Sequence, residues 1–218
     1  MLYRAHFAMI RSPLITSYGL PTSALFGFLN QLFRILKKEN PDYVATIFDR
    51  KEKTFRHKKY PEYKATRDPM PEELQEQLPH LWKLIEAMQI PQLSKVGFEA
   101  DDIIGVLVDH CKENPTLILS SDKDFIQLQK FDKVKQWSPL QKKFIVGDPA
   151  ESLYDKTIRG DTGDGVPNIL SSDDTLITEG KRQTPVTKKK MELWRGKKPE
   201  EFCNEAMLRN YHRNKTMV

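Results

Sequence analysis

The stretch Glu99-Ala-Asp101-Asp102, followed further along the chain by Asp122-Lys-Asp124, decides how the rest of the sequence is interpreted. Between the two lie an apolar helix-like segment, 103–111, and a short apolar run, 116–120, that is typical of a buried strand. One set of acids therefore opens a helix, and the next set follows a strand. Carboxylates at such places in an α/β sheet favour a hard divalent cation. The alternative is ordinary helix-capping and turn chemistry.

Composition indicates a globular protein with one sizeable core. The chain has 218 residues, of which 39% are hydrophobic and 30% are charged, and its net charge is +5. No apolar run approaches the ~20 residues of a membrane span, and the N-terminus has no signal-peptide pattern. Cys111 and Cys203 lie far apart without metal-ligand spacing, so we expect free thiols and a cytoplasmic setting. The positive charge favours a polyanionic partner.

Hydrophobic periodicity predicts strands that alternate with helices. The predicted helices cover 22–39, 72–89, 99–111, 124–129, 187–195 and 199–211, and the predicted strands cover 43–48, 90–93, 116–120, 134–137 and 143–146. This order predicts an α/β fold with a mostly parallel sheet flanked by helices. Ligands of such sheets bind outside the carboxyl ends of the strands, so we expect the acids to converge on that edge.

The acids form a larger set than the two opening clusters. Its members are Asp49, Glu99, Asp101, Asp102, Asp122, Asp124, Asp161 and Asp164. So many carboxylates raise each other's pKa and repel unless cations neutralise them. Two Mg²⁺ ions would do so, and a pair ~3.5–4 Å apart can clamp the attacking and leaving oxygens of a phosphodiester. Scattered surface and capping acids are the alternative.

A basic segment with interleaved aromatic residues, 50–67, is suited to a nucleic acid. Lysine and arginine neutralise phosphates, and aromatic rings stack on unpaired bases. Its candidate contacts are Lys58, Lys59, Tyr63, Lys64 and Arg67. A solvated loop with Tyr60 and Tyr63 packed inward is the alternative. Further along, Lys188, Lys189 and Lys190 either contact a duplex backbone or form an exposed helix face.

Several short motifs carry a resemblance to a known family. They are Leu2-Tyr-Arg-Ala, Phe48-Asp49, Thr54-Phe-Arg56, Tyr63-Lys64 with Arg67, Met70-Pro71, Glu99-Ala-Asp-Asp102, Ser121-Asp-Lys-Asp124, Gln136-Trp-Ser-Pro139 and Gly160-Asp161 with Asp164. Over roughly 1–195 the chain resembles the 5′ nuclease (flap endonuclease) superfamily. The first part is similar to the 5′–3′ exonuclease domain of bacterial DNA polymerase I. From about Asp122 it is more similar to the phage 5′ nuclease known as ribonuclease H.

The resemblance implies a role for each matched residue. It assigns the first metal ion to Asp49, Glu99, Asp101 and Asp102, and the second to Asp122, Asp124, Asp161 and Asp164. It assigns the scissile phosphate to Arg56, Lys64 and Arg67, and a stacked terminal base to Tyr63. The implied ions are Mg²⁺, with Mn²⁺ as a substitute, and a monovalent cation in a helix–hairpin–helix segment.

The resemblance also implies a domain organisation. We expect a PIN-like 5′ nuclease core over 1–160, with an arch segment at about 50–70, and a helix–hairpin–helix-like DNA-binding segment over 161–218. The family begins with a central strand that ends in an aspartate. We expect that strand to be missing here, and the C-terminal segment to be truncated without a closing element.

The leading hypothesis is a metal-dependent, structure-specific 5′ nuclease that acts on DNA flaps, 5′ ends or RNA primers by a two-metal-ion mechanism. Its expected partners are branched or nicked DNA, RNA–DNA primer hybrids and replication proteins, and we expect a cytoplasmic monomer with no membrane contact. The alternative is a catalytically impaired family member that still binds branched DNA. A magnesium-dependent phosphatase is a third reading, which the basic–aromatic segment disfavours.

Overall fold

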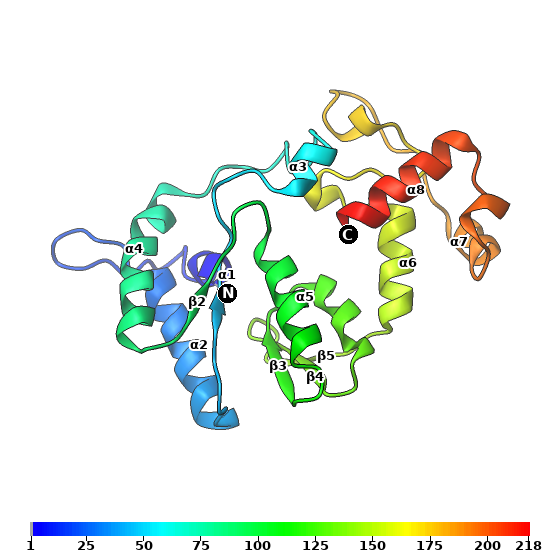
Figure 1. Cartoon of the computed structure of the whole chain (residues 1–218). Helices are drawn as coiled ribbons and strands as arrows, with labels where there is room; N and C mark the ends of the chain where they lie inside the picture. Colours follow the sequence, from blue (N-terminus) through cyan, green and yellow to red (C-terminus); the bar gives the residue numbers. More distant parts are fainter. Residues whose placement is uncertain (1) are drawn as a thin grey trace. The chain divides into compact units, whose positions relative to one another are not determined.

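The structure is a computed structural model that describes residues 2–218. Its contacts divide the chain into two compact units, and Figure 1 labels most of their α-helices and strands. Unit 1 takes in the residues up to Arg50, Pro69–Phe125 and Phe131–Val146, and unit 2 takes in Lys51–Asp68, Ile126–Lys130 and Gly147–Val218. The contacts thus group the segments 51–68 and 147–160 with the C-terminal part, whereas the predicted boundary at 160 places them in the core.

Unit 1 alternates helices and strands as the periodicity predicts. Its elements are α1 (Leu2–Ala8), α2 (Ser23–Glu39), β1 (Thr46–Ile47), α4 (Glu72–Ala87), β2 (Gln92–Leu93), α5 (Ala100–His110), β3 (Thr116–Leu119), β4 (Val134–Ser138) and β5 (Lys143–Ile145). The 3₁₀ helix η1 (Lys123–Lys130) begins in unit 1 and continues into unit 2.

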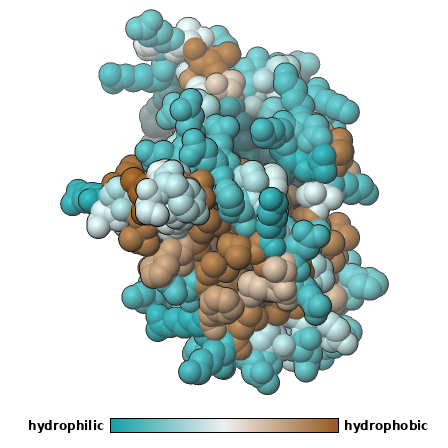
Figure 2. Space-filling view, turned by 90° about the vertical axis from the view of Figure 1, so that its left-hand side faces the viewer, coloured by the Kyte–Doolittle hydropathy of each residue, from teal (hydrophilic) through white to brown (hydrophobic). Residues whose placement is uncertain are grey.

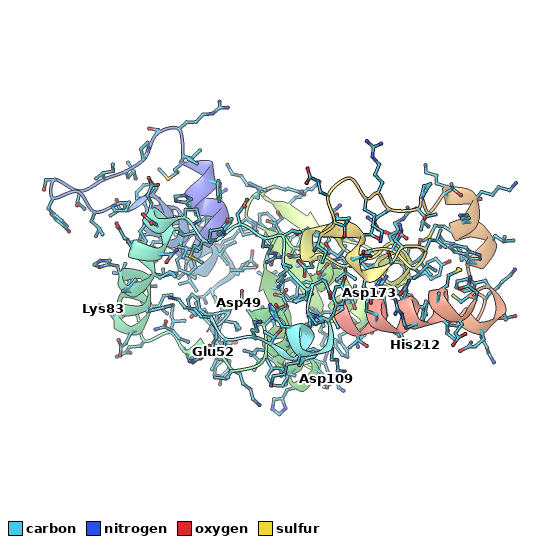
Figure 3. The ribbon with its side chains drawn as sticks, turned by 90° about the horizontal axis from the view of Figure 1, so that it is seen from above. Asp49, Glu52, Lys83, Asp109, Asp173 and His212 are labelled. Atoms are coloured by element: carbon cyan, nitrogen blue, oxygen red, sulfur yellow. The ribbon has the colours of Figure 1, made fainter. Side chains whose placement is uncertain are left out.

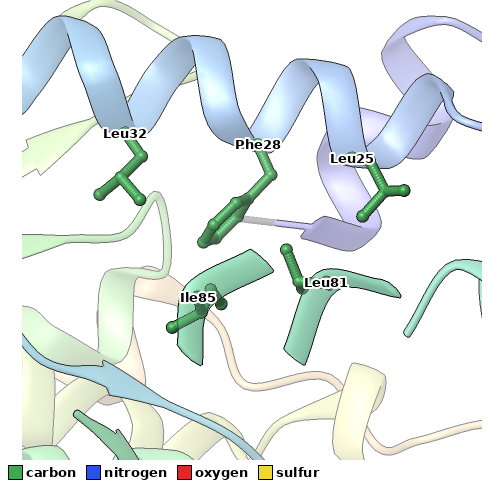
Figure 4. Packing of buried hydrophobic residues seen from close by; sticks show 5 residues of the cluster. All are labelled: Leu25, Phe28, Leu32, Leu81 and Ile85. Carbon is green, nitrogen blue, oxygen red and sulfur yellow. The ribbon is translucent and has the colours of Figure 1, made fainter. Parts of the chain in front are cut away.

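The core of unit 1 forms where α2 packs on α4. Leu25, Phe28 and Leu32 of α2 meet Leu81 and Ile85 of α4 (Figure 4). These α2 positions recur at three and four residues, so they share one face of the helix. Burial of such side chains contributes roughly 1.5–3 kcal/mol each. The core therefore holds α2 and α4 together.

One apolar residue of α2 lies outside this core. The surface of Phe33 is 53% exposed, whereas Ile35 is buried. The reason is angular, because successive helical residues lie about 100° apart and Phe33 is displaced from the stripe that Phe28, Leu32 and Ile35 follow. Apolar side chains are also exposed elsewhere, and the face that Figure 2 draws shows some of them at the surface. Hydrophobicity alone therefore does not mark the core.

The strands form two small sheets. In the first, β1 pairs with β2 in parallel. In the second, β3 pairs with β4 in parallel, and β4 pairs with β5 antiparallel, so the strands predicted at 134–137 and 143–146 are confirmed and form a hairpin. The predicted α/β architecture is confirmed, with the parallel pairing divided between two short sheets. Asp49 follows the end of β1 and Asp122 follows the end of β3, as expected.

Unit 2 is helical and contains more regular structure than the sequence predicted. Its elements are α3 (Phe55–Lys59), α6 (Pro149–Arg159), η2 (Thr162–Asp164), η3 (Asp173–Leu176), α7 (Lys188–Trp194), η4 (Pro199–Glu201) and α8 (Glu205–Met217). Helix α6 was not predicted, although Asp148 caps it by accepting a hydrogen bond from the Glu151 amide and Pro149 follows the cap. Both residues are ordinary helix-start signals.

Helix α8 corrects the expectation that the C-terminal segment lacks a closing element. The sequence predicted only a weak helix at 199–211, but α8 runs to Met217 and buries Asn210, Asn214 and Met217. The Asn214 amide nitrogen donates to the carbonyls of Thr157 and Pro167 at 2.9 and 3.0 Å. Asparagine side chains thus replace part of an apolar face, so a hydrophobic pattern could not identify this packing helix.

Among residues 2–218, no helix is both long enough and apolar enough to cross a bilayer.

Candidate functional site

The first acidic cluster forms at the start of α5. The Ala100 amide, at the N-terminus of that helix, donates to Asp49 Oδ1 at 2.8 Å. Glu99 is the N-cap residue, and its own amide donates to Asp102 Oδ2 at 2.9 Å in a capping box. Capping is therefore one use of these acids, and it also gathers the three carboxylates around the end of one helix.

The second acidic cluster lies on the turn that follows β3. The Asp122 amide donates to Ser120 Oγ, and Asp122 Oδ1 accepts from the Asp124 amide, each at 3.1 Å. Gln136 of β4, which is 1% exposed, donates through Nε2 to the carbonyls of Ser120 and Asp122. A buried glutamine thus fixes the backbone that carries both aspartates. The sequence indicated Gln136 only as part of a motif, without this role.

Asp101 connects the two clusters of unit 1. Water reaches its side chain, but partial desolvation, followed by the charges of Asp122, Asp49, Asp124 and Glu99, raises the pKa of Asp101 to about 7. Carboxylates from β1, α5 and the turn after β3 are therefore close enough to repel one another, as the topology predicted. Figure 3 labels Asp49.

The donor set suits a hard divalent cation. All its members are carboxylate oxygens, and their mutual repulsion is what such a cation relieves. Within the part of the chain that the structure describes, no three acidic, histidine or cysteine side chains are already drawn together closely enough to hold an ion. Repelling carboxylates would have to move toward a cation as it binds.

The other two predicted metal ligands belong to unit 2, on the turn Gly160–Gly165. The amide of Asp161 donates to the Val166 carbonyl, and the Val166 amide donates back, at 2.8 and 2.7 Å. Asp161 Oδ1 also accepts from the amides of Gly163 and Asp164, which closes η2. The turn presents Asp161 and Asp164 from one compact loop.

Both carboxylates of this turn meet basic groups of unit 2. Lys156 Nζ lies 2.7 Å from Asp161 Oδ2. Partial burial raises the pKa of Asp161, but the hydrogen bond and charge of Lys156 outweigh it and hold that pKa below its usual value. Lys156 was not among the predicted site residues, and only the tertiary structure places it against Asp161.

Asp164 contacts the basic segment 50–67. Its Oδ2 accepts a hydrogen bond from Tyr63 Oη at 2.8 Å, its Oδ1 pairs with Arg67, and Lys64 Nζ lies 3.8 Å from Oδ2. The Tyr63 side chain is buried, as the inward-packing alternative proposed, and does not present its ring for base stacking. Its ring packs with Tyr60, Val166 and Met217 instead.

The remaining predicted contacts are dispersed. Arg56 is largely buried, and its Nε donates to the Met217 carbonyl at 3.0 Å. Lys58 and Lys59 are exposed at the end of α3, and Lys188 and Lys189 are exposed at the start of α7, whereas Lys190 is half-buried. The exposed lysines are accessible, and their contact with a phosphate backbone stays a prediction.

Tyr60 should make the stability of unit 2 fall at alkaline pH. Its hydroxyl donates to the carbonyls of Gly165 and Asp173 at 3.2 and 2.8 Å, and burial is the main cause that raises its pKa to about 12. Because the folded-state pKa exceeds the ordinary value of 10.0, the associated stability is present below pH 10 and is lost as pH rises toward 12.

Between pH 10 and pH 12 the free energy of unfolding of the wild-type protein should fall by an amount on the order of 2 kcal/mol because of Tyr60. We expect this fall to be absent in Tyr60→Phe, as measured by urea unfolding at several alkaline pH values. Tyr43→Phe is the control, since Tyr43 is 94% exposed. An equal alkaline loss in the wild-type protein and the Tyr60 variant would contradict the assignment.

Comparison with known proteins identifies similar sequences. The family model described as the 5′-3′ exonuclease, N-terminal resolvase-like domain matches residues 1–156. The chain is 37% identical over 185 residues to DNA polymerase I of Caldicellulosiruptor bescii, with 78% of this chain and 22% of that protein covered. It is 37% identical over 179 residues to a 5′-3′ exonuclease of Aquifex aeolicus, with 77% of this chain and 61% of that protein covered. The chain thus spans less than two thirds of the length of these relatives.

Two solved structures share the fold. A bacteriophage T5 protein co-crystallised with metal ions superposes with a TM-score of 0.65 at 18% identity, over 88% of this chain and 80% of that one. A bacteriophage T5 flap endonuclease, solved with DNA and metal ions, superposes with a TM-score of 0.60 at 20% identity, over 86% and 79%. At these identities the similarity establishes the fold.

Proposed function

Because the chain belongs to the 5′-3′ exonuclease family with an N-terminal resolvase-like domain, we propose that it hydrolyses phosphodiesters in DNA 5′ flaps, 5′ ends or RNA primers with two divalent metal ions. The observation that carries the proposal is the set of carboxylates at the start of α5 and on the turn after β3, where the Ala100 amide binds Asp49 and the Asp124 amide binds Asp122. Desolvation, followed by these neighbouring charges, raises the pKa of Asp101 among them. The relatives and the bacteriophage T5 structures, which are named for exonuclease or flap endonuclease activity and for complexes with metal ions or DNA, support it.

Different residues of the chain would bind the two metal ions and the phosphate. Asp49, Glu99, Asp101 and Asp102 would hold one ion, Asp122 and Asp124 would hold the other, and Asp161 and Asp164 would join them after leaving their basic partners. When bound, Mg²⁺ or Mn²⁺ would activate the attacking water and neutralise the developing charge on the phosphate. Lys64 and Arg67 would hold the phosphate, and Arg56 is the third residue that we propose for this role.

Other parts of unit 2 would contact DNA away from the bond that is cut. Lys58 and Lys59 on α3 and Lys188, Lys189 and Lys190 on α7 would neutralise backbone phosphates, so affinity would fall as salt rises. A monovalent cation would bind the helix–hairpin–helix-like segment after Asp164. We propose replication of DNA in the cytoplasm as the setting, with the chain acting as a monomer.

The direct test is cleavage of a 5′-labelled flap duplex by this chain with and without Mg²⁺. The expected result is that a cleavage product is released only when Mg²⁺ is present. Mn²⁺ is expected to support the same cleavage when it replaces Mg²⁺. A duplex of the same sequence without a flap is the matched substrate control. Binding of the flap without any metal-dependent cleavage would overturn the enzymatic proposal.

That outcome would favour the second candidate, a DNA-binding family member with impaired catalysis. One observation points toward it, because the carboxylates of Asp161 and Asp164 are each paired with basic side chains of the same unit. Those pairs oppose metal binding at the second position. The cleavage assay therefore separates the two functions.

A further inference from the structure

The carboxylate of Asp164 lies among groups that suit a phosphate. Tyr63 Oη donates to its Oδ2 at 2.8 Å, Lys64 Nζ lies 3.8 Å from the same oxygen, and the Arg67 guanidinium binds its Oδ1. An ammonium and a guanidinium around one anion are a phosphate-binding combination, and the Tyr63 hydroxyl orients the anion between them. In this structure the anion is a side chain of the protein itself.

The backbone holds Asp164 and Lys64 in register. The Lys64 amide donates to the Asp164 carbonyl at 2.8 Å, and Lys64 has a left-handed backbone with φ of 57°. The neighbouring Gly165 allows this approach, since a Cβ there would lie 2.9 Å from the Glu62 carbonyl. Because these contacts do not involve the Lys64 ammonium, that group can exchange anions without dismantling the turn.

We propose that Asp164 acts as an internal competitor for the phosphate that Lys64 and Arg67 bind. The carboxylate pairs with both cations when DNA is absent, and a phosphodiester displaces it when DNA binds. The released carboxylate is then available to a metal ion. This inference rests on the proposed function, and it predicts that removing the Asp164 charge strengthens DNA binding in the absence of metal.

The exposures of the side chains fit such an exchange. Side-chain exposure is 54% for Arg67, 19% for Lys64 and 21% for Asp164. The pairs are therefore reached by water, and partly exposed ion pairs are weak enough for an incoming phosphate to replace them. A fully buried pair would cost far more to separate.

The experiment measures binding of a fluorescein-labelled 5′-flap duplex in EDTA by fluorescence anisotropy at low salt. Asp164→Asn is compared with Asp161→Asn, which removes the same charge from the same turn but frees Lys156 in place of Lys64 and Arg67. We expect Asp164→Asn to bind about fivefold more tightly than Asp161→Asn. Equal affinities, or weaker binding by Asp164→Asn, would overturn the competitor role.

A second pair of variants tests the same idea without a change of charge. Tyr63→Phe removes the hydroxyl that orients Asp164, and Tyr60→Phe removes a hydroxyl of the same cluster that bonds carbonyls instead. Tyr63→Phe is expected to bind DNA about twofold more tightly than Tyr60→Phe, since one contact is lost. If Asp164→Asn does not fold, this pair decides, and equal affinities would overturn the proposal.

Cleavage with Mg²⁺ distinguishes this inference from the proposed function. Tighter metal-free binding by Asp164→Asn, together with no cleavage by the wild-type chain, would sustain the competitor and overturn the nuclease. Metal-dependent cleavage by the wild-type chain, together with equal DNA binding by Asp164→Asn and Asp161→Asn, would support the nuclease and overturn the competitor role of Asp164. If neither the wild-type chain nor Asp164→Asn binds DNA, the nuclease function and the competitor role are both overturned.

Discussion

Asp101→Asn is expected to lower Mg²⁺-dependent flap cleavage by roughly 10²-fold or more, with DNA affinity in EDTA changed by no more than about twofold. The reason is the position of Asp101, whose charge couples to Asp49, Glu99, Asp122 and Asp124. An amide has the same shape but cannot neutralise a cation. The measurements are single-turnover cleavage and metal binding by calorimetry.

The control for this variant lies on the same helix. Asp109→Asn also removes a charge from α5, and Asp109, which is labelled in Figure 3, pairs with Lys112 near the end of the helix. Its cleavage rate is expected to match the wild-type rate. Asp101→Asn should not destabilise the metal-free protein, because it removes repulsion. A lower melting temperature in EDTA, with unchanged metal affinity, would indicate a structural carboxylate.

The raised pKa of Asp101 also predicts a pH profile. Below about pH 7 the protonated carboxyl cannot bind an ion, so cleavage at subsaturating Mg²⁺ should fall as pH falls through that value. Higher Mg²⁺ should move the midpoint to lower pH, since metal and proton compete. Folding of the metal-free protein has the opposite sign: because the folded-state pKa of Asp101 is raised, protonation stabilises the folded state, and stability should rise as pH falls through about 7.

Gly160→Ala is expected to destabilise unit 2 by about 3 kcal/mol or more. Gly160 has φ of 69° and ψ of −165°, a conformation that is essentially restricted to glycine. A Cβ there would lie 2.3 Å from the Val166 carbonyl oxygen and 2.5 Å from that of Pro167. Both are backbone atoms, so relief requires the turn that carries Asp161 and Asp164 to open. Urea unfolding measures the loss.

Gly180 provides the matched control. It also has positive φ, at 74°, but no heavy atom lies within 4 Å of a Cβ built there. Gly180→Ala should therefore lower the free energy of unfolding by only about 1 kcal/mol, which is the strain of a side chain in a left-handed backbone conformation. Similar losses for both variants would show that the contact with Val166 and Pro167 is not what requires glycine at 160.

Local sequence signals determined much of unit 1 and the identity of the acids. The apolar stripe of α2, the strand before Asp49 and the hairpin of β4 and β5 depend on periodicity and turns, which are local properties. The motif around Glu99 predicted a helix start with acids in its first turn, and the capping box confirms it. The family followed from the same motifs.

Only the tertiary structure decided how those residues are used. Gln136 supports the Asp122 turn, Lys156 pairs with Asp161, and Tyr63 is buried against Met217. Each contact joins positions that are distant in the chain or depends on the direction of a side chain, and neither leaves a periodic signal. Burial and neighbouring charge likewise set the pKa of Asp101. The sequence therefore determined which chemical groups are present, and the fold decided which of them repel, pair or compete, because those interactions depend on distance and solvent exposure.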